Sequence, residues 1–173
     1  MRAPFHSVVL LALTLAGCGQ APSAIADAPS LARSAEHGTT RRPISGSCEL
    51  TFSPAPPSVP APPPGILRQV DVGTCQISHL GRSDYRGLLD IDFAAGTQTG
   101  SRTFTAANGD QLHSTVVGTS APSGPTTRSI SATFTFTGGT GRFAGARGEA
   151  KASATANLAT SSTSVVFEGW IEY

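Results

Sequence analysis

Four side chains carry groups that often bind metal ions in proteins: His79, His113, Asp90 and Asp92. Asp90 and Asp92 lie two residues apart in a segment with strand-like alternation, so their carboxylates share one face and could meet at one ion. Strong metal sites usually show motifs such as His-x-x-x-His or Cys-x-x-Cys, and the sequence has neither. We therefore expect no metal site, and interpret both aspartates as solvent-facing residues beside Arg86 or Arg102.

Other common site chemistry is also missing from the sequence. No Gly-x-Ser-x-Gly motif marks a serine nucleophile. The glycines of residues 138–141 are not followed by Lys-Ser or Lys-Thr, which a phosphate-binding loop requires. Aromatic residues make up 6% of the chain and are not interleaved with basic ones, which argues against nucleic-acid binding. We expect neither a cofactor nor a recognisable catalytic group.

The N-terminal residues have the features of an export signal. Arg2 provides a positive start, and residues 8–16 form an apolar stretch of signal-peptide length, shorter than the ~20 residues that span a bilayer. The stretch ends in Leu15-Ala16-Gly17-Cys18, which resembles the lipobox of bacterial lipoproteins. The resemblance implies cleavage before Cys18, diacylglycerol on its sulfur and, in many bacteria, a further acyl chain on its amine. An ordinary secretory signal with an incidental cysteine is the alternative.

Lipidation would place the protein in the cell envelope, with its folded domain outside the cytoplasm. Two or three acyl chains hold a protein on a membrane stably, whereas a single chain does so only marginally. An aspartate after the acylated cysteine often marks retention in the inner membrane. Gly19 stands there instead, which favours the outer membrane in a bacterium that has two.

The composition divides the chain into three parts. We expect residues 1–17 to be the signal peptide, residues 18–43 the lipidated cysteine with a flexible tether, and residues 44–173 one folded domain. Residues 19–42 are rich in Ala, Pro, Ser and Thr without apolar periodicity, which is typical of disorder. Without Arg2, the chain has 11 basic and 11 acidic residues. This balance argues against a nucleic-acid or anionic-lipid surface.

Cys48 and Cys75 would be the only thiols left after lipidation. Export places them in an oxidising compartment, where a disulfide between them would close a loop of about 28 residues. On the loop-entropy model this bond stabilises the fold by roughly 3–4 kcal/mol. A reactive pair of one cysteine with His79 is the alternative, but it needs a reduced thiol and lacks an evident third group. We therefore predict the disulfide.

From Ile44 onward, apolar residues recur at every second position, which predicts β-strands. Residues 54–64 interrupt this pattern with seven prolines and must form a loop or an arm, with a proline-rich recognition segment as the alternative. Asn108-Gly109-Asp110 predicts a tight hairpin turn, because Asn and Gly accept positive φ. The predicted strands lie within residues 48–52, 67–79, 85–93, 102–107, 111–119, 127–137, 146–158 and 165–173.

The segment of residues 146–158 is ambiguous because alanine is the best helix former. Its glycine and alanines nevertheless fall on every second position from 148 to 156, opposite charged and polar residues. We therefore predict a strand whose small side chains lie where neighbours crowd. About eight antiparallel strands result, and closing them into a small barrel removes exposed edges. The predicted fold class is thus an all-β barrel.

Two segments of this chain, residues 137–148 and the end of the last predicted strand, residues 167–173, resemble the C-terminal half of the allene oxide cyclase and dirigent-like barrels. The first segment reads Thr-Gly-Gly-Thr-Gly-Arg-Phe-Ala-Gly-Ala-Arg-Gly. The similarity covers about residues 67–173 and implies an eight-stranded antiparallel barrel. Gly138, Gly139 and Gly141 would allow positive φ in the turn, and Phe143 could plug the barrel end. Characterised members bind hydrophobic small molecules, but none of their functional residues maps onto this chain, so the resemblance carries fold and not activity.

Three functions are compatible with this sequence. The sequence favours a non-enzymatic envelope lipoprotein whose barrel binds a small apolar ligand or a partner protein. A structural barrel with a filled interior is the second hypothesis. The third is a cyclase- or dirigent-like enzyme that uses polar groups such as Tyr85, Asp90 or Arg102. An apolar cavity would favour the first, a packed interior the second, and a cavity with converging polar groups the third.

Overall fold

The computed structural model describes residues 40–173. The predicted signal peptide, Cys18 and residues 18–39 of the predicted tether lie outside the described residues. Within the described part, no helix is long and apolar enough to cross a membrane.

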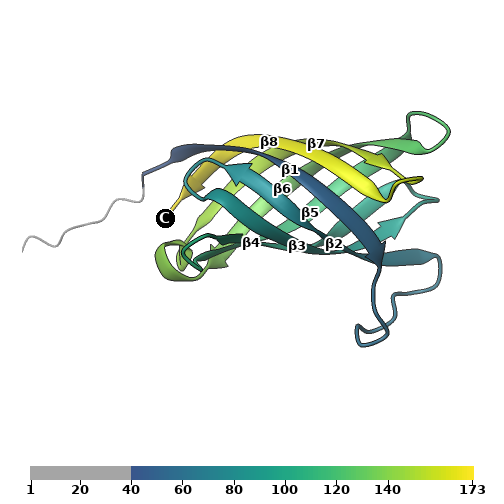
Figure 1. The fold of residues 1–173 in the computed structure, drawn as a ribbon, viewed down its shortest axis with the longest axis horizontal. Coiled ribbons are helices and arrows are strands. Elements are labelled where there is room, and N and C mark those ends of the chain that lie inside the picture. Colours follow the sequence, from purple (N-terminus) through teal and green to yellow (C-terminus); the bar gives the residue numbers. More distant parts are fainter. Residues whose placement is uncertain (1–39) are drawn as a thin grey trace, which may run out of the picture. The chain divides into compact units, whose positions relative to one another are not determined.

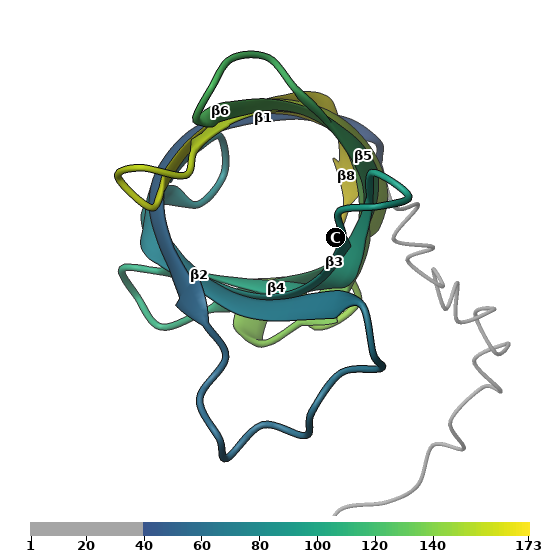
Figure 2. The same cartoon turned by 90° about the vertical axis from the view of Figure 1, so that its right-hand side faces the viewer.

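Eight antiparallel strands form a closed barrel, as the sequence predicts (Figures 1 and 2). Each strand pairs with its neighbour along the chain, and the first pairs with the last, so no edge is left open. The strands are β1 (Arg42–Pro54), β2 (Ile66–Ile77), β3 (Gly81–Asp92), β4 (Thr97–Ala106), β5 (Gln111–Pro122), β6 (Thr127–Gly139), β7 (Arg147–Asn157) and β8 (Ser162–Glu172).

The alternation of side chains decides which residues lie inside the barrel. On β6, Ala132, Phe134 and Phe136 are buried, while Ser131 before them and Thr135 between them are exposed. The ambiguous alanine-rich segment is a strand, β7, and its alanines also face inward. Period two therefore outweighs the helix propensity of alanine here, because each strand needs one inward face.

Strand ends differ from the predicted bounds where a turn residue stops the ladder. β2 ends at Ile77, since His79 adopts a positive φ of 71° in the turn that follows. β3 ends at Asp92, whose carboxylate accepts hydrogen bonds from the backbone N–H groups of Ala94 and Ala95 at 2.9 and 2.8 Å. Phe93 lies past this strand end and is 43% exposed.

One end of the barrel is plugged. The connections of residues 78–80, 107–110 and 140–146 lie there, and the last of them contains a short 3-10 helix, η1 (Gly141–Phe143). Phe143 is fully buried, and its ring centre lies 4.9 Å from that of Tyr173. Arg42 at the start of β1 also lies at this plugged end, beside the last residues of β8.

The opposite end of the barrel, which we call the mouth, carries the other four connections. These are residues 55–65, 93–96, 123–126 and 158–161. Figure 2 looks into this end and shows the 55–65 and 123–126 connections projecting outward from the ring of strands. The proline-rich connection is fixed by the Nη1 atom of Arg68, which donates to the Pro60 carbonyl oxygen at 2.6 Å.

Candidate functional site

A pocket extends from the mouth into the barrel interior. It encloses about 610 Å³ of space not filled by protein atoms, including the part open to solvent. Only about 40 Å³ of this space is wide enough for the centre of a water molecule, so the pocket is narrow. Most of its lining is apolar, and this part includes Ile91, Ile130, Ala132, Ala154, Phe134 and Val165.

Small side chains on β6 and β7 create the pocket. Ala132, Ala152, Ala154 and Ala156 all line it. Crowding accounts for Ala132, because a Cβ on the facing Gly118 would lie 2.7 Å from the alanine Cβ. The alanines of β7, in contrast, leave space that larger side chains would fill.

Arg102 lies at the floor of the pocket. It points inward from β4 and is 7% exposed. Its guanidinium carbon lies 4.2 Å from the centre of the Phe134 ring and 5.9 Å from that of Tyr85. Phe104 and Phe167, with ring centres 6.1 Å apart, belong to the same aromatic layer, which fills the middle of the barrel. This layer separates the pocket from the plugged end.

A glycine makes room for a hydroxyl group beside Arg102. Gly87 on β3 pairs with Asp71 on one side and with Arg102 on the other. A Cβ at Gly87 would lie 2.7 Å from the hydroxyl oxygen of Tyr85. The hydroxyl thus takes up the space of a missing side chain, on the row of residues that joins Asp71 to Arg102.

Burial sets the protonation of this floor. It raises the pKa of the Asp71 carboxyl, against the opposing effects of a 2.8 Å hydrogen bond from Gln69 Nε2 and of the Arg102 charge. Burial lowers the pKa of Arg102, while Tyr85 and Asp71 oppose that shift. It also raises the pKa of Tyr85, so this hydroxyl keeps its proton at neutral pH. Asp71 and Arg102 form no ion pair within 4.0 Å.

The interior also contains polar atoms without hydrogen-bond partners in the described protein. They are Ser83 Oγ, Tyr85 Oη, Arg102 Nε and Ser114 Oγ. Buried polar groups rarely lack a partner, because an unmade hydrogen bond costs free energy. Ser114 is the β5 partner of Arg102, and Ser83 lies on the same face of β3 as Tyr85. Arg102 Nε, Tyr85 Oη and Ser114 Oγ thus belong to one row of paired residues, whereas Ser83 lies nearer the plugged end.

A second arginine lines the pocket near the mouth. Arg128 donates from Nε and Nη2 to Ser120 Oγ at 3.2 and 3.1 Å, and from Nη2 to the Ser120 carbonyl oxygen at 3.0 Å. Its guanidinium carbon lies 5.0 Å from the centre of the Phe93 ring. Unlike Arg102, this arginine has protein partners for its Nε and Nη2 atoms.

The structure separates the predicted metal candidates. Asp90 accepts two hydrogen bonds of 2.6 Å from Nε and Nη2 of Arg68, its partner across β2 and β3. The predicted partners, Arg86 or Arg102, are therefore wrong, because the register brings Arg68 opposite and Arg102 points inward. Asp92 binds backbone N–H groups of the next turn. Residues 40–173 contain no group of three or more potential metal ligands.

Cys48 and Cys75 form the predicted disulfide. They are direct partners across β1 and β2, and both face the barrel interior. His79, the alternative partner, instead makes a 2.8 Å hydrogen bond between its Nε2 atom and the Pro43 carbonyl oxygen. His113 Nε2 lies 3.3 Å from the side-chain oxygen of Gln111. Neither histidine therefore belongs to the pocket floor.

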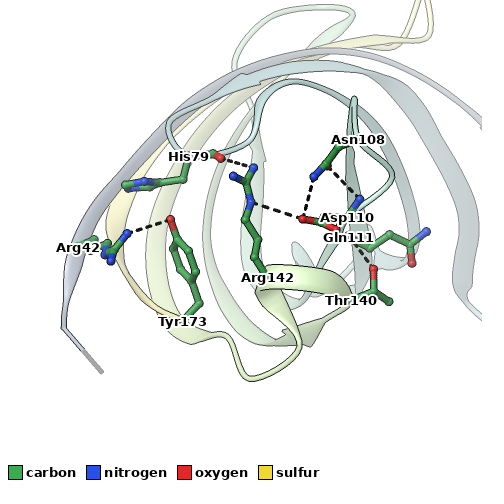
Figure 3. Close-up of polar contacts among 8 residues, drawn as sticks. All are labelled: Arg42, His79, Asn108, Asp110, Gln111, Thr140, Arg142 and Tyr173. Carbon is green, nitrogen blue, oxygen red and sulfur yellow. Dashed lines mark hydrogen bonds and ion pairs between the residues drawn. The ribbon is translucent and has the colours of Figure 1, made fainter. Parts of the chain in front are cut away.

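The glycine-rich turn belongs to the plugged end. Gly138 and Gly141 have positive φ values of 115° and 54°, as expected. Gly139 is needed for a different reason, since its Cβ would lie 1.9 Å from the Gln111 carbonyl oxygen. Arg142 reaches from this turn across the barrel end, donates to the His79 carbonyl oxygen at 2.6 Å, and pairs with Asp110 (Figure 3).

The sequence identified part of the pocket floor. Of the predicted polar candidates, Arg102 lines the pocket, Tyr85 lies beside it in the buried core, and Asp90 faces outward. Gln69, Asp71 and Gln98 line the pocket but were not predicted. Gln69 and Asp71 share the alternation of Cys75 and Ile77, and a polar residue on an inward face is the signal that could have revealed them.

No family model, curated protein or solved structure matches this chain. The resemblance to allene oxide cyclase and dirigent-like barrels thus stays a prediction based on residues 137–148 and 167–173. The arguments for a function come from the pocket and from the N-terminal sequence.

Proposed function

We propose that this protein is a lipid-anchored envelope protein whose barrel binds a small, mostly apolar molecule through its mouth. The observation that carries the proposal is a pocket with apolar walls that is also lined by the buried Arg102, whose Nε atom has no hydrogen-bond partner in the described protein. Binding sites for small molecules typically combine such walls with a few polar groups that orient the ligand. A barrel of eight strands is wide enough to hold one small ligand.

The narrowness of the pocket favours the main competing function, a structural barrel with a filled interior. About 40 Å³ of room holds only a few water molecules. A ligand must therefore widen the pocket, and Phe93 and Leu158 at the mouth are exposed enough to move without opening the core. A cyclase-related enzyme could use only Tyr85 and Arg102 of the three polar candidates, because Asp90 faces outward. We assign no reaction to these two residues.

The pocket is tested with N-phenyl-1-naphthylamine, an uncharged dye that fluoresces in apolar surroundings. Residues 18–173 with Cys18→Ser are exported with an ordinary secretory leader in place of residues 1–17, so that neither lipid nor detergent interferes. We expect a fluorescence increase with one dye bound per chain. Ala154→Leu, which places a larger side chain in the pocket, should abolish it, whereas Ser153→Leu, which adds leucine to the outer face of the same strand, should not.

Two results would support the structural barrel instead. One is the absence of dye binding together with the absence of any co-purified molecule in native mass spectrometry of the wild-type protein. The other is equal dye binding by the Ala154→Leu and Ser153→Leu proteins, because the dye would then lie outside the barrel.

The anchor is tested separately on the native chain in bacterial cells. We expect incorporation of a clickable palmitate analogue into the wild-type protein and none into the Cys18→Ser protein. The mass of the mature N-terminal peptide should correspond to an acylated Cys18. Unchanged labelling of the serine variant would contradict the anchor and leave the pocket proposal intact.

A further inference from the structure

We infer that the ligand of this pocket carries an anionic oxygen group that enters first and lies against Arg102 and the Tyr85 hydroxyl, with its apolar part toward the mouth. The inference rests on the proposed function and specifies the chemical class of the ligand. Its basis is a buried guanidinium group that has aromatic neighbours but no carboxylate partner.

The buried charge of Arg102 has no anionic partner in the described protein. The side chain is almost fully buried, and its Nε atom has no hydrogen-bond partner in the described protein. Its closest neighbours include the ring of Phe134, which offsets the charge only in part. Buried charges are normally paired, because removing a charge from water costs more than a cation–π contact returns.

Asp71 does not act as the anionic partner of Arg102. Its Oδ1 atom accepts the hydrogen bond of Gln69, and it forms no ion pair with Arg102 although the two charges influence each other. The Tyr85 hydroxyl occupies the Gly87 position on the row between them. The two charges therefore stay apart, and the arginine remains open to an acceptor from the pocket.

Tyr85 offers a second donor beside Arg102, whose guanidinium carbon lies 5.9 Å from the centre of the tyrosine ring. Its hydroxyl is buried, unpartnered and protonated. A carboxylate or sulfonate has several oxygens, so one can accept from Arg102 Nε while another accepts from Tyr85. Hydrogen bonds from a charged donor to an anion are stronger than those between neutral groups. An anionic head group is thus favoured over an alcohol or a ketone.

The arginine near the mouth is not an equivalent site. The Nε and Nη2 donors of Arg128 are already used by Ser120, and its side chain packs against Phe93. Between Arg128 and Arg102 the walls are alanines and branched aliphatic residues, which suit the apolar part of the ligand. The head group therefore passes the mouth and binds at the floor.

Two dyes of the same ring system test this inference. 8-Anilinonaphthalene-1-sulfonate is the anionic counterpart of N-phenyl-1-naphthylamine, and both are titrated against residues 18–173 carrying Cys18→Ser. We expect the anionic dye to bind more tightly to the parent protein. Arg102→Met should weaken the anionic dye about 10-fold or more and change the Kd of the neutral dye less than about twofold.

The matched control is Arg128→Met, which removes the other arginine of the same pocket. It should weaken the anionic dye less than about threefold, because its main donors are not free. Two further variants cover a folding failure of Arg102→Met, which near-UV circular dichroism would detect. Arg102→Lys should keep the preference for the anion, and Tyr85→Phe should reduce it without changing any charge.

Three outcomes distinguish the two proposals. Equal weakening of both dyes by Arg102→Met would overturn the anionic head group and leave apolar binding in place. A larger loss with Arg128→Met than with Arg102→Met would also overturn it, because the head group would then lie at the mouth. Failure of both dyes to bind the parent protein would overturn the proposed function and this inference together.

Discussion

Gly87 determines where the Tyr85 hydroxyl lies. The glycine has no positive φ in this structure, so its value is space and not backbone freedom. Because its Cβ position is occupied by the hydroxyl, the tyrosine ring can lean across the row that joins Asp71 and Arg102. One missing methyl group thus positions a donor of the pocket floor.

Gly87→Ala should force the Tyr85 ring to move. The new Cβ would approach the hydroxyl oxygen at 2.7 Å, which no real contact tolerates. We expect a loss of about 1–3 kcal/mol in the free energy of unfolding, typical of overpacking, measured by urea denaturation. Tyr85→Phe removes the closest atom, so the double variant Gly87→Ala/Tyr85→Phe should recover part of this loss. If the stability losses of the two single variants simply added in the double variant, the proposed clash between the new Cβ at position 87 and the Tyr85 hydroxyl would be wrong.

Asp71 should make stability depend on pH in the direction opposite to an ordinary surface aspartate. Burial raises its folded pKa above the unfolded value, so its contribution is fully present below the unfolded pKa and is lost as the pH rises through the folded pKa. Asp71→Asn keeps the shape without the charge. We expect it to unfold at a higher urea concentration than the wild type at pH 7, with the difference shrinking as the pH falls toward 4.

Asp90→Asn is the matched control, because the hydrogen bonds from Arg68 lower the pKa of Asp90. The Asp90 contribution is present above its unfolded pKa and lost as the pH falls through its folded pKa. This variant should therefore be less stable than the wild type at pH 7 and equal to it in strong acid. If both variants changed with pH in the same direction, the opposite environments described for the two carboxyls would be wrong.

Among the elements, β1 and β2 are joined both by hydrogen bonds and by a covalent link. Cys48 and Cys75 face each other inside the barrel, 27 residues apart in sequence. The disulfide closes a loop that contains the paired ends of β1 and β2 and the proline-rich connection between them. Its stabilising effect therefore comes chiefly from the unfolded chain, whose freedom it restricts.

Removing the disulfide with Cys48→Ala/Cys75→Ala should lower the free energy of unfolding by roughly 3–4 kcal/mol on the loop-entropy model. Urea denaturation of the oxidised wild type and of the double variant measures the difference. Reduced wild-type protein should resemble the variant. An unchanged midpoint in the double variant would show that the loop is already restricted in the unfolded chain.

The strands could be predicted from the sequence because the pattern repeats. On β6 and β7 the inward residues are apolar or small and the outward ones polar, and this alternation repeats several times along each strand. Strand ends were harder, since Asp92 ends β3 through a local hydrogen bond to the backbone. The site was harder still: Asp71 is a charged residue at an inward position, and only its alternation with Cys75 and Ile77 marks it as inward.

At the scale of the whole molecule, closure joins the two ends of the described chain. β1 and β8 are paired although more than one hundred residues separate them in sequence. Such distant contacts form late, because their loop-closure entropy is not offset until many other contacts exist. The barrel is therefore expected to fold as one unit and not strand by strand.

A circular permutant should show this. Arg42 Nη1 lies 3.4 Å from the Tyr173 hydroxyl, so a short Gly-Ser linker can join residues 42 and 173. New ends between Gly124 and Pro125 lie in an exposed connection. We expect the permutant to fold with a free energy of unfolding close to the parent, measured by urea denaturation.

Deletion of residues 162–173 provides the contrast. It removes β8 and leaves two unpaired edges on β1 and β7. We expect this shortened chain to aggregate or to remain unfolded by circular dichroism. A soluble, folded product would mean that closure is not required.

Arg42 and Tyr173 both lie at the plugged end, so a handle on the C-terminus leaves the mouth free. A biosensor chip that holds the protein by its C-terminus would therefore leave the mouth facing the flowing solution. Likewise, a surface that holds the chain at Arg42 would face the plugged end, and the mouth would point away from that surface into the solution.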